Sequence, residues 1–183
     1  MPEPADTPDP LRSLERQVKG RRNFDEPPIH LWNPPLSGDI DIEIRADGSW
    51  WHEGDPIRRE AIVRLFASIL RREDDGEYYL VTPAEKWRLR VEAHPLTIIE
   101  IEAGADGEEG VYTATLNTGK RYPIDAEHPL FLDRERDGVA GIRLPHGLSA
   151  LCTRPAWYRL VEQAEEVDGV PAIRSSGNTW PLA

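Results

Sequence analysis

Residues 55–91 combine a helical pattern with a strand pattern, and this pairing constrains the fold more than any other stretch of the chain. Apolar residues recur at helical spacing over residues 57–70, which predicts the buried face of an amphipathic helix. Asp55 can cap the start of that helix, Pro56 suits its first position, and Asp75-Gly76 provides turn chemistry to end it. The expected buried face comprises Ile57, Ala61, Ile62, Leu65, Phe66, Ile69 and Leu70.

A β-hairpin is expected to follow the helix. Residues 78–82 are rich in strand-forming side chains, and residues 86–91 alternate between basic and apolar side chains. The alternation places Trp87, Leu89 and Val91 toward a core. It places Lys86, Arg88 and Arg90 toward solvent.

A reduced copy of this unit closes the chain. The shared features are a glycine eight residues before a proline, a later Asp-Gly pair and a tryptophan eleven residues after that pair's glycine. They are Gly48, Pro56, Asp75-Gly76 and Trp87 in the first copy, and Gly147, Pro155, Asp168-Gly169 and Trp180 in the second. The common order predicts an internal duplication in which residues 48–89 and 147–182 are equivalent and the second helix is shorter. Two unrelated hairpins that share turn residues are the alternative.

Strand signals dominate the rest of the chain. Ile40, Ile42 and Ile44 alternate with acidic residues, which predicts a half-buried strand, and Asn117-Thr118-Gly119 is typical of a hairpin turn. Further short strands are expected at 49–52, 96–101, 111–116, 120–124, 130–132, 139–144 and 148–152, with a second helix from about 155 to 165. The predicted fold class is therefore α+β, internally duplicated, with antiparallel β-rich units that each have one main helix.

The expected domain organisation has three parts. Residues 1–25 form a flexible N-terminal segment, with disorder over residues 1–10 and a short helix where Leu11, Leu14 and Val18 have helical spacing. Residues 26–93 form the first repeat unit, and residues 94–183 form the second, packed on the first. An acidic, glycine-rich loop is expected at 104–110.

Composition excludes several classes of protein. A net charge of −11 argues against a general binder of nucleic acids or anionic membranes. The single cysteine, Cys152, allows neither an intramolecular disulfide nor a thiolate zinc site. No apolar run approaches the roughly 20 residues that span a bilayer, and the proline-rich, acidic N-terminus is unlike a signal peptide. We therefore expect a cytoplasmic protein.

Basic residues in and around the hairpin form the candidate ligand site. Lys86, Arg88 and Arg90 form a basic stripe on one strand face, and such side chains suit a phosphate through charge-assisted hydrogen bonds. An aromatic neighbour could stack on a base. The residues expected to contact a ligand are Arg64, Arg72, Tyr79, Lys86, Arg88 and Arg159, of which Arg159 is the repeat equivalent of Arg64.

Each of these candidates also has a structural explanation. The stripe could pair across strands with Glu100 and Glu102, and Arg64 could pair with Glu60 one helical turn away. Arg64 and Arg159 would then make equivalent structural salt bridges. Aromatic side chains at alternating strand positions are more often core residues than stacking platforms.

No pattern of metal-binding or catalytic residues stands out. The five histidines show no fixed ligand spacing, so neither a metal nor another cofactor is expected. Thr118-Gly119-Lys120 lacks the first glycine and the final Ser or Thr of a phosphate-binding loop. Ser149 and Cys152 lie near His146 in sequence, but no nucleophile elbow or other activating context is visible. Cys152 is expected to be a small buried residue.

Several segments carry a family resemblance. They read SGDIDI (37–42), DGSW (47–50), GDPI (54–57), LRREDDG (70–76) and YYLVTPAEK (78–86). Together they resemble the proteobacterial family called domain of unknown function 1285, most specifically over residues 32–91. The resemblance implies a duplicated core, a C-terminal half similar to pleckstrin-homology-like folds, a nucleotide-like ligand between the halves and a role in signalling. It implies no established activity.

The favoured hypothesis is a non-enzymatic regulatory or sensor protein that binds a small anionic, nucleotide-like ligand between its two halves. The alternative is a protein-interaction scaffold, in which exposed strand edges and the acidic surface receive a partner. An enzyme with an unrecognised site is the third hypothesis, and convergent carboxylate and histidine side chains would support it.

Overall fold

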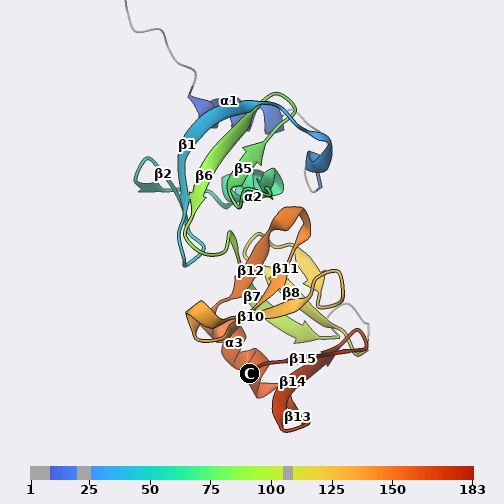
Figure 1. The fold of residues 1–183 in the computed structure, drawn as a ribbon. Helices are drawn as coiled ribbons and strands as arrows, with labels where there is room; N and C mark the ends of the chain where they lie inside the picture. Colours follow the sequence, from blue (N-terminus) through green and yellow to red (C-terminus); the bar gives the residue numbers. More distant parts are fainter. Residues whose placement is uncertain (1–8, 20–25, 105–108) are drawn as a thin grey trace, which may run out of the picture. The chain divides into compact units, whose positions relative to one another are not determined.

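The computed structural model describes residues 9–19, 26–104 and 109–183. The chain divides into two compact units, which are coloured along the sequence in Figure 1. Unit 1 comprises Met1–Glu43 and Ser49–Val91, and unit 2 comprises Ile44–Gly48 and Glu92–Ala183. Apart from its last two residues, the disorder predicted for 1–10 lies outside the described residues, as does the middle of the loop predicted at 104–110.

In the described part of unit 1, the strands form a six-stranded sheet in the order β3-β2-β1-β6-β5-β4. Their bounds are β1 (Leu36–Ile44), β2 (Trp50–His52), β3 (Asp55–Pro56), β4 (Leu70–Arg72), β5 (Tyr78–Val81) and β6 (Lys86–Val91). The two central strands are parallel neighbours, because the contacts of β6 with Ser37, Asp39 and Asp41 advance in the same direction along both strands. The first and last strands of the unit therefore meet at its centre.

The core of unit 1 lies on one face of this sheet. Ile40 and Ile42 on β1 are buried, and Asp39 and Asp41, which alternate with them, are exposed, so the predicted alternation is confirmed. Two helices, α1 (Pro10–Lys19) and α2 (Glu60–Ser68), add buried side chains that include Leu14 and Phe66. Apolar burial of this kind supplies most of the stability of a small domain.

The start of α2 differs from the prediction. Asp55 and Pro56 do not begin the helix but form β3, which pairs with β2 through the turn at Glu53 and Gly54. Both turn residues have positive φ, 49° and 83°, which is the backbone of a tight two-residue hairpin. The helix begins only at Glu60, after three residues that follow the hairpin, with Arg59 at its N-cap position.

The end of α2 also differs. The helix stops at Ser68, and Leu70 begins β4, where it lies opposite Leu80 of β5. The Asp75-Gly76 turn therefore joins two strands rather than ending the helix. Of the predicted apolar face, Ala61 is exposed, and Ile57 and Leu65 are half-buried; Ile62 and Phe66 form the buried face of the helix itself.

Unit 2 contains a second six-stranded sheet within its described residues, in the order β10-β11-β12-β7-β8-β9. Its strands are β7 (Leu96–Ala103), β8 (Tyr112–Leu116), β9 (Arg121–Pro123), β10 (Leu130–Asp133), β11 (Val139–Arg143) and β12 (Ser149–Cys152). Strand β12 pairs with β7 in parallel, and the other neighbours in the sheet are antiparallel. The hairpin predicted at Asn117-Thr118-Gly119 joins β8 to β9.

A helix and a small sheet complete unit 2. Helix α3 (Arg154–Glu162) packs on β7 and β12, and Thr153 caps it by accepting a hydrogen bond from the Ala156 N–H. The small sheet has the order β13-β14-β15. Its strands are β13 (Glu165–Val167), β14 (Val170–Ser175) and β15 (Asn178–Pro181). Short 3-10 turns occur at Ile29–Leu31, Arg134–Arg136 and Pro145–Gly147.

The two units repeat one sheet topology. Numbered from its own first strand, each six-stranded sheet has the order 3-2-1-6-5-4, read from one edge or the other, with a parallel pair at its centre. The predicted α+β fold with an internal duplication is therefore confirmed. A pleckstrin-homology-like arrangement of unit 2 stays a prediction.

The helix-and-hairpin repeat predicted from the sequence does not coincide with this repeat of the two six-stranded sheets. Each helix is followed by three antiparallel strands with an Asp-Gly turn between the first two, and Trp87 lies opposite Leu80 as Trp180 lies opposite Ile173. However, β6 is a central strand of a six-stranded sheet, whereas β15 is an edge of the small sheet. The two helices are also equal in length, at nine residues each. No helix among the described residues is long and apolar enough to cross a membrane.

Candidate functional site

A row of polar side chains crosses one face of the sheet in unit 1. Arg71 on β4 lies opposite Tyr79 on β5, and Tyr79 lies opposite Arg88 on β6. Arg88 in turn contacts Asp39 on β1. Because directly opposite residues in paired strands point to the same side, this row forms a continuous polar surface across the middle of the sheet.

Arginines and aspartates pair along the two central strands. The Arg88 guanidinium donates two hydrogen bonds to Asp39, at 2.7 and 3.1 Å, and Arg90 lies 3.3 Å from Asp41 and 3.8 Å from Glu43. The hydrogen bond from Arg88 holds the pKa of Asp39 below its usual value and raises that of Arg88. Both partners are therefore charged at neutral pH.

These pairs line an open groove of about 540 Å³ on unit 1. Its walls are formed by Asp39, Ile40, Asp41, Glu77, Arg88, Leu89 and Arg90. Ile40 and Leu89 are buried side chains, so the charged residues supply the surface chemistry of the groove. A groove of this volume lies within the usual size range of small-molecule sites, but its lining is far more polar than most.

A second, better-shielded charge cluster lies beside the groove. Glu73 accepts hydrogen bonds from Arg71 at 2.6 Å and from Lys86 at 3.1 Å, and all three side chains are at most 25% exposed. Burial alone would raise the pKa of Glu73, but the hydrogen bonds from Arg71 and Lys86 outweigh it and lower the pKa. Arg71 also donates to the carbonyls of Ile29 and Trp32, so the cluster fastens that segment to the sheet.

Tyr79 joins the two charged regions. Its hydroxyl donates to Asp75 at 2.5 Å, and the Lys86 ammonium lies 4.7 Å from its ring centre. The bond to Asp75 and the burial of the ring raise the pKa of Tyr79 to about 12. Only 4% of Tyr79 is exposed, so its ring has no free face for stacking in this structure.

The structure brings some predicted site residues together and separates others. Tyr79, Lys86 and Arg88 share one face of unit 1. Strand alternation places Arg72 on the other face, with its guanidinium 5.5 Å from the Tyr78 ring centre. Arg64 is exposed on α2 and lies 3.5 Å from Glu60, as the structural explanation predicted.

The predicted partners of the basic stripe were wrong. Lys86 pairs with Glu73, and Arg88 and Arg90 pair with the acidic side of β1 rather than with Glu100 or Glu102. Glu100 instead lies 3.7 Å from Arg159 within unit 2. The alternation of acids along β1 and bases along β6 was the signal that could have identified this pairing.

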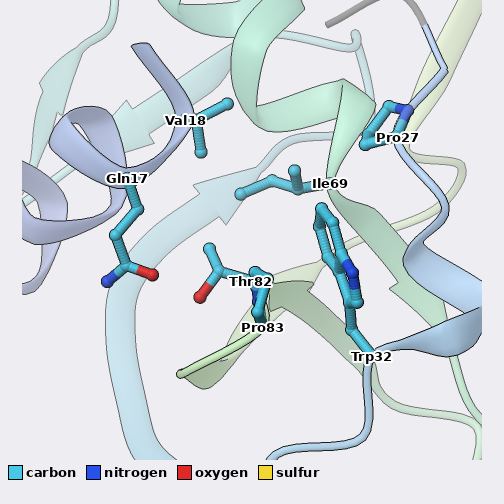
Figure 2. Close-up of a pocket in the computed structure, with 7 residues that line it drawn as sticks. All are labelled: Gln17, Val18, Pro27, Trp32, Ile69, Thr82 and Pro83. Atoms are coloured by element: carbon cyan, nitrogen blue, oxygen red, sulfur yellow. The ribbon is translucent and has the colours of Figure 1, made fainter. Parts of the chain in front are cut away.

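A small apolar hollow lies elsewhere in unit 1. Figure 2 shows Trp32, Val18 and Ile69 converging on it, and its other lining residues are Gln17, Pro27, Thr82 and Pro83. At about 10 Å³ it has room for one water molecule, and its lining is apolar, so we regard it as a packing gap at the seam between α1 and the sheet.

Among residues 9–19, 26–104 and 109–183, no three His, Cys, Asp or Glu side chains are grouped to hold a metal ion. Cys152 is 7% exposed, and burial raises the pKa of its thiol to about 12, which makes it a poor nucleophile.

Comparisons with known proteins identify the family. The N-terminal domain of the DUF1285 family, a domain of unknown function, matches residues 27–94, and its C-terminal domain matches residues 95–182. A DUF1285 family protein from Silicibacter pomeroyi DSS-3 is 37% identical, with a TM-score of 0.82 over 92% of this chain and 93% of that chain.

A second structure shows the same relationship at lower similarity. A DUF1285 family protein from Shewanella baltica OS155 is 28% identical, with a TM-score of 0.57 over 69% of this chain and 94% of that chain. A search among proteins of curated function found no match. Since the two domain matches together span most of its length, the chain belongs to the DUF1285 family.

Proposed function

We propose that the protein is a regulatory or sensor module that binds a small anionic, nucleotide-like ligand, and that the groove on unit 1 holds the ligand's anionic group. The observation that supports this proposal is the pair of arginines, Arg88 and Arg90, that line the groove side by side on β6. The planar guanidinium group of arginine is well suited to bidentate hydrogen bonds with phosphate oxygens.

The ion pairs in the groove are weak enough to be exchanged. The side chains of Arg88 and Asp39 are 42% and 67% exposed, and those of Arg90 and Asp41 are 71% and 59% exposed. Exposed pairs of this kind contribute only about 0–1 kcal/mol to stability. A phosphate group can therefore replace the aspartates as the acceptor of the arginine hydrogen bonds at little cost in free energy. The more buried Glu73 cluster would meanwhile keep the sheet face in place.

The acidic residues of the groove restrict the kind of anion that fits. Asp39, Asp41 and Glu77 outnumber the two arginines, so a simple anion meets repulsion as well as attraction. A nucleotide supplies hydroxyl and amino donors beside its phosphate, and these can bind the carboxylates that the arginines release. This match favours a nucleotide-like ligand over inorganic phosphate.

A protein partner is the second candidate, and one observation favours it. The groove presents both charges in alternation, which also suits a polypeptide with mixed charges. Two exposed apolar residues belong to the same unit: Leu31, at 68% exposed, precedes β1, and Leu36, at 49%, is the first residue of β1. A partner would cover both apolar residues, whereas a small ligand in the groove would leave them exposed.

Isothermal titration calorimetry with ATP, GTP, cyclic AMP and inorganic pyrophosphate, at low and high salt, tests the proposal. Arg88→Ala should weaken binding of the best nucleotide by about 10- to 150-fold, the equivalent of about 1.5–3 kcal/mol for a charged hydrogen bond. Arg64→Ala removes another exposed arginine, which lies on α2 and does not line the groove, and serves as the control.

Two outcomes would overturn the small-ligand proposal. One is the absence of measurable heat for all four compounds at low salt, and the other is equal affinity for the parent and Arg88→Ala. Either result would leave the protein-partner candidate as the better explanation of the groove. Lys86→Ala is a less suitable probe, because it leaves the shielded Glu73 with only Arg71 and so alters stability as well as charge.

A further inference from the structure

Three polar side chains in unit 2 form a hydrogen-bonded chain that the proposed ligand site does not use. His94 Nε2 lies 2.9 Å from Asp133 Oδ2, and His94 Nδ1 lies 2.8 Å from Ser149 Oγ. The three residues come from separate parts of the chain: the segment before β7, the end of β10 and the start of β12. Their order is carboxylate, imidazole and hydroxyl, which is the arrangement that activates a serine nucleophile.

The protonation of this chain follows from the carboxylate. Burial alone would raise the pKa of Asp133, but the hydrogen bonds from His94 and from the Glu135 N–H outweigh it and lower the pKa. An ionised carboxylate can only accept, so His94 Nε2 carries the hydrogen that it donates to Asp133. In the tautomer with that single hydrogen, Nδ1 offers a lone pair to the Ser149 hydroxyl, which is the geometry of a general base.

The surroundings of Ser149 contain a further cation and an aromatic ring. Arg143 lies directly opposite Ser149 in the β11–β12 pair, so the two side chains share a sheet face. The Arg143 guanidinium stacks 4.2 Å from the centre of the Phe131 ring, and that ring lies 5.5 Å from the ring of His94. Arg143 is exposed and Ser149 is 4% exposed, so Arg143 is the residue of this face through which a substrate would first meet the cluster.

Gly141 makes room for this arrangement. It stands opposite Phe131 and two residues from Arg143 on the same face of β11. A Cβ atom at this position would lie 2.5 Å from the Phe131 ring and 2.5 Å from the Ala150 carbonyl oxygen. Glycine therefore leaves the space over Gly141 to the Phe131 ring, which contacts Arg143 and His94.

We propose that Ser149 is a nucleophile activated by His94, with Asp133 as the positioning residue, and that the cluster accepts an acyl group from a small ester that carries a negative charge near Arg143. In the first step the Ser149 Oγ bonds to the ester carbonyl carbon while its proton passes to His94 Nδ1. The carbon–oxygen bond to the alcohol then breaks, and the alcohol leaves with that proton. Water, activated by the same imidazole, releases the acid and restores the serine.

A structural role is the competing explanation for the same contacts. His94 lies three residues after the end of β6, and its two hydrogen bonds also fasten the segment that enters β7. A purely structural histidine would give Ser149 no special reactivity. Reactivity of the hydroxyl, rather than stability, therefore separates the two explanations.

A fluorophosphonate probe on the full-length chain tests the proposal without any substitution. The serine oxygen would bond to phosphorus and fluoride would leave, while His94 takes the serine proton. Peptide mass spectrometry should find the probe on Ser149 and not on Ser175, a fully buried serine that makes hydrogen bonds only to backbone groups. Absence of the probe from Ser149 under conditions that label a known serine hydrolase would overturn the proposal.

Variants then assign the roles. Ser149→Ala should abolish labelling, and His94→Ala should lower its rate at least about tenfold, since positioned acid–base groups contribute about 10²–10⁴-fold to rates. Asp133→Asn should lower the rate and leave the labelled residue unchanged. Thermal unfolding of each variant checks the fold, and unchanged labelling in a folded His94→Ala protein would contradict the assignment of the base. Hydrolysis of a chromogenic acetate should be lost in the same variants.

Discussion

The two units have the same strand order but use the centre of the sheet differently. In unit 1 the central parallel pair, β1 and β6, is apolar on one face and bears ion pairs on the other. In unit 2 the central pair, β12 and β7, is buried or half-buried over all of its paired residues. A shared topology therefore does not determine which sheet face is available to a ligand.

The placement of the helix explains part of this difference. Helix α2 lies between the third and fourth strands of unit 1, whereas α3 follows the sixth strand of unit 2 and packs directly on β7 and β12. Parallel central strands are usually covered on both faces, and unit 2 follows that rule. Unit 1 departs from it, and its uncovered face is neutralised by alternating acids and bases instead.

The largest expected effects compare how much α2 and α3 each contribute to the free energy of unfolding. Phe66 in α2 and Leu160 in α3 are both completely buried. Phe66→Ala should lower the free energy of unfolding by about 3–5 kcal/mol, and Leu160→Ala by about 2–5 kcal/mol. Leu65→Ala, at a half-buried position of α2, is the control and should cost less than Phe66→Ala. Urea denaturation measures all three, and a larger loss for Leu65→Ala would contradict the observed helix orientation.

The second prediction compares a shielded carboxylate from each unit. Glu73→Ala leaves both Arg71 and Lys86 without their shared partner, and we expect a loss of about 2–3 kcal/mol at pH 7. Asp133→Ala should cost less, because its arginine partner, Arg136, is more exposed than Arg71 and Lys86 and lies 3.4 Å away. Chemical denaturation distinguishes them, and the reverse order would mean that the unit 2 cluster has the greater structural importance.

The pH dependence of stability gives a separate test of the Glu73 carboxylate of unit 1. The pKa of Glu73 is lower in the folded chain than its ordinary value of 4.5, so its ionised form stabilises the fold above that pH. This contribution is lost as pH falls from about 4.5 through the lowered pKa. Glu73→Gln should therefore show a shallower loss of stability between pH 5 and 3, and a curve parallel to that of the parent would contradict the account.

A smaller effect is expected from the tyrosines at high pH. The pKa of Tyr79 in unit 1 is raised to about 12, so its neutral form stabilises the fold up to about pH 10, and this stability is lost as pH rises toward 12. Tyr79→Phe should flatten that decline and cost about 1 kcal/mol at pH 7 through the lost hydrogen bond to Asp75. Tyr112 in unit 2 also has a raised pKa, so Tyr112→Phe is the matched control. An unchanged decline in Tyr79→Phe would refute the assignment.

The smallest effects concern exposed ion pairs in each unit. Asp39→Ala in unit 1 and Glu100→Ala in unit 2 each remove one partner of an exposed pair. Both should leave the midpoint of thermal unfolding nearly unchanged. A fall in that midpoint for Asp39→Ala as large as the one for Glu73→Ala would mean that the groove pairs are structural and not exchangeable.

Local patterns in the sequence predicted the elements whose environment is local. The alternation around Ile42 identified β1 and its buried face, because a strand with one buried face has a period of two residues. The helix at Leu14 and Val18 was likewise predicted from spacing alone. The bounds of α2 were not, because the turn at Glu53 and Gly54 and the pairing of Leu70 with Leu80 override a favourable helical pattern.

The candidate sites depended on contacts between distant residues. Arg88 meets an aspartate that is 49 residues away, because the first and last strands of unit 1 are neighbours. His94 is separated from Asp133 by 39 residues and from Ser149 by 55, so no fixed spacing could identify that cluster. His146 is the histidine nearest to Ser149 in sequence, whereas the histidine that contacts Ser149 in the structure is His94.

The proposed function requires that the groove arginines of unit 1 exchange their aspartate partners for an anionic ligand. Nuclear magnetic resonance of the full-length, ¹⁵N-labelled protein during titration with ATP observes this exchange directly. The side-chain Nε–H signals of Arg88 and Arg90 should shift together with the β1 amides around Asp39 and Asp41, and the shifts should diminish at high salt. Shifts confined to other residues, with the Arg88 and Arg90 signals unchanged at saturating ATP, would contradict the claim.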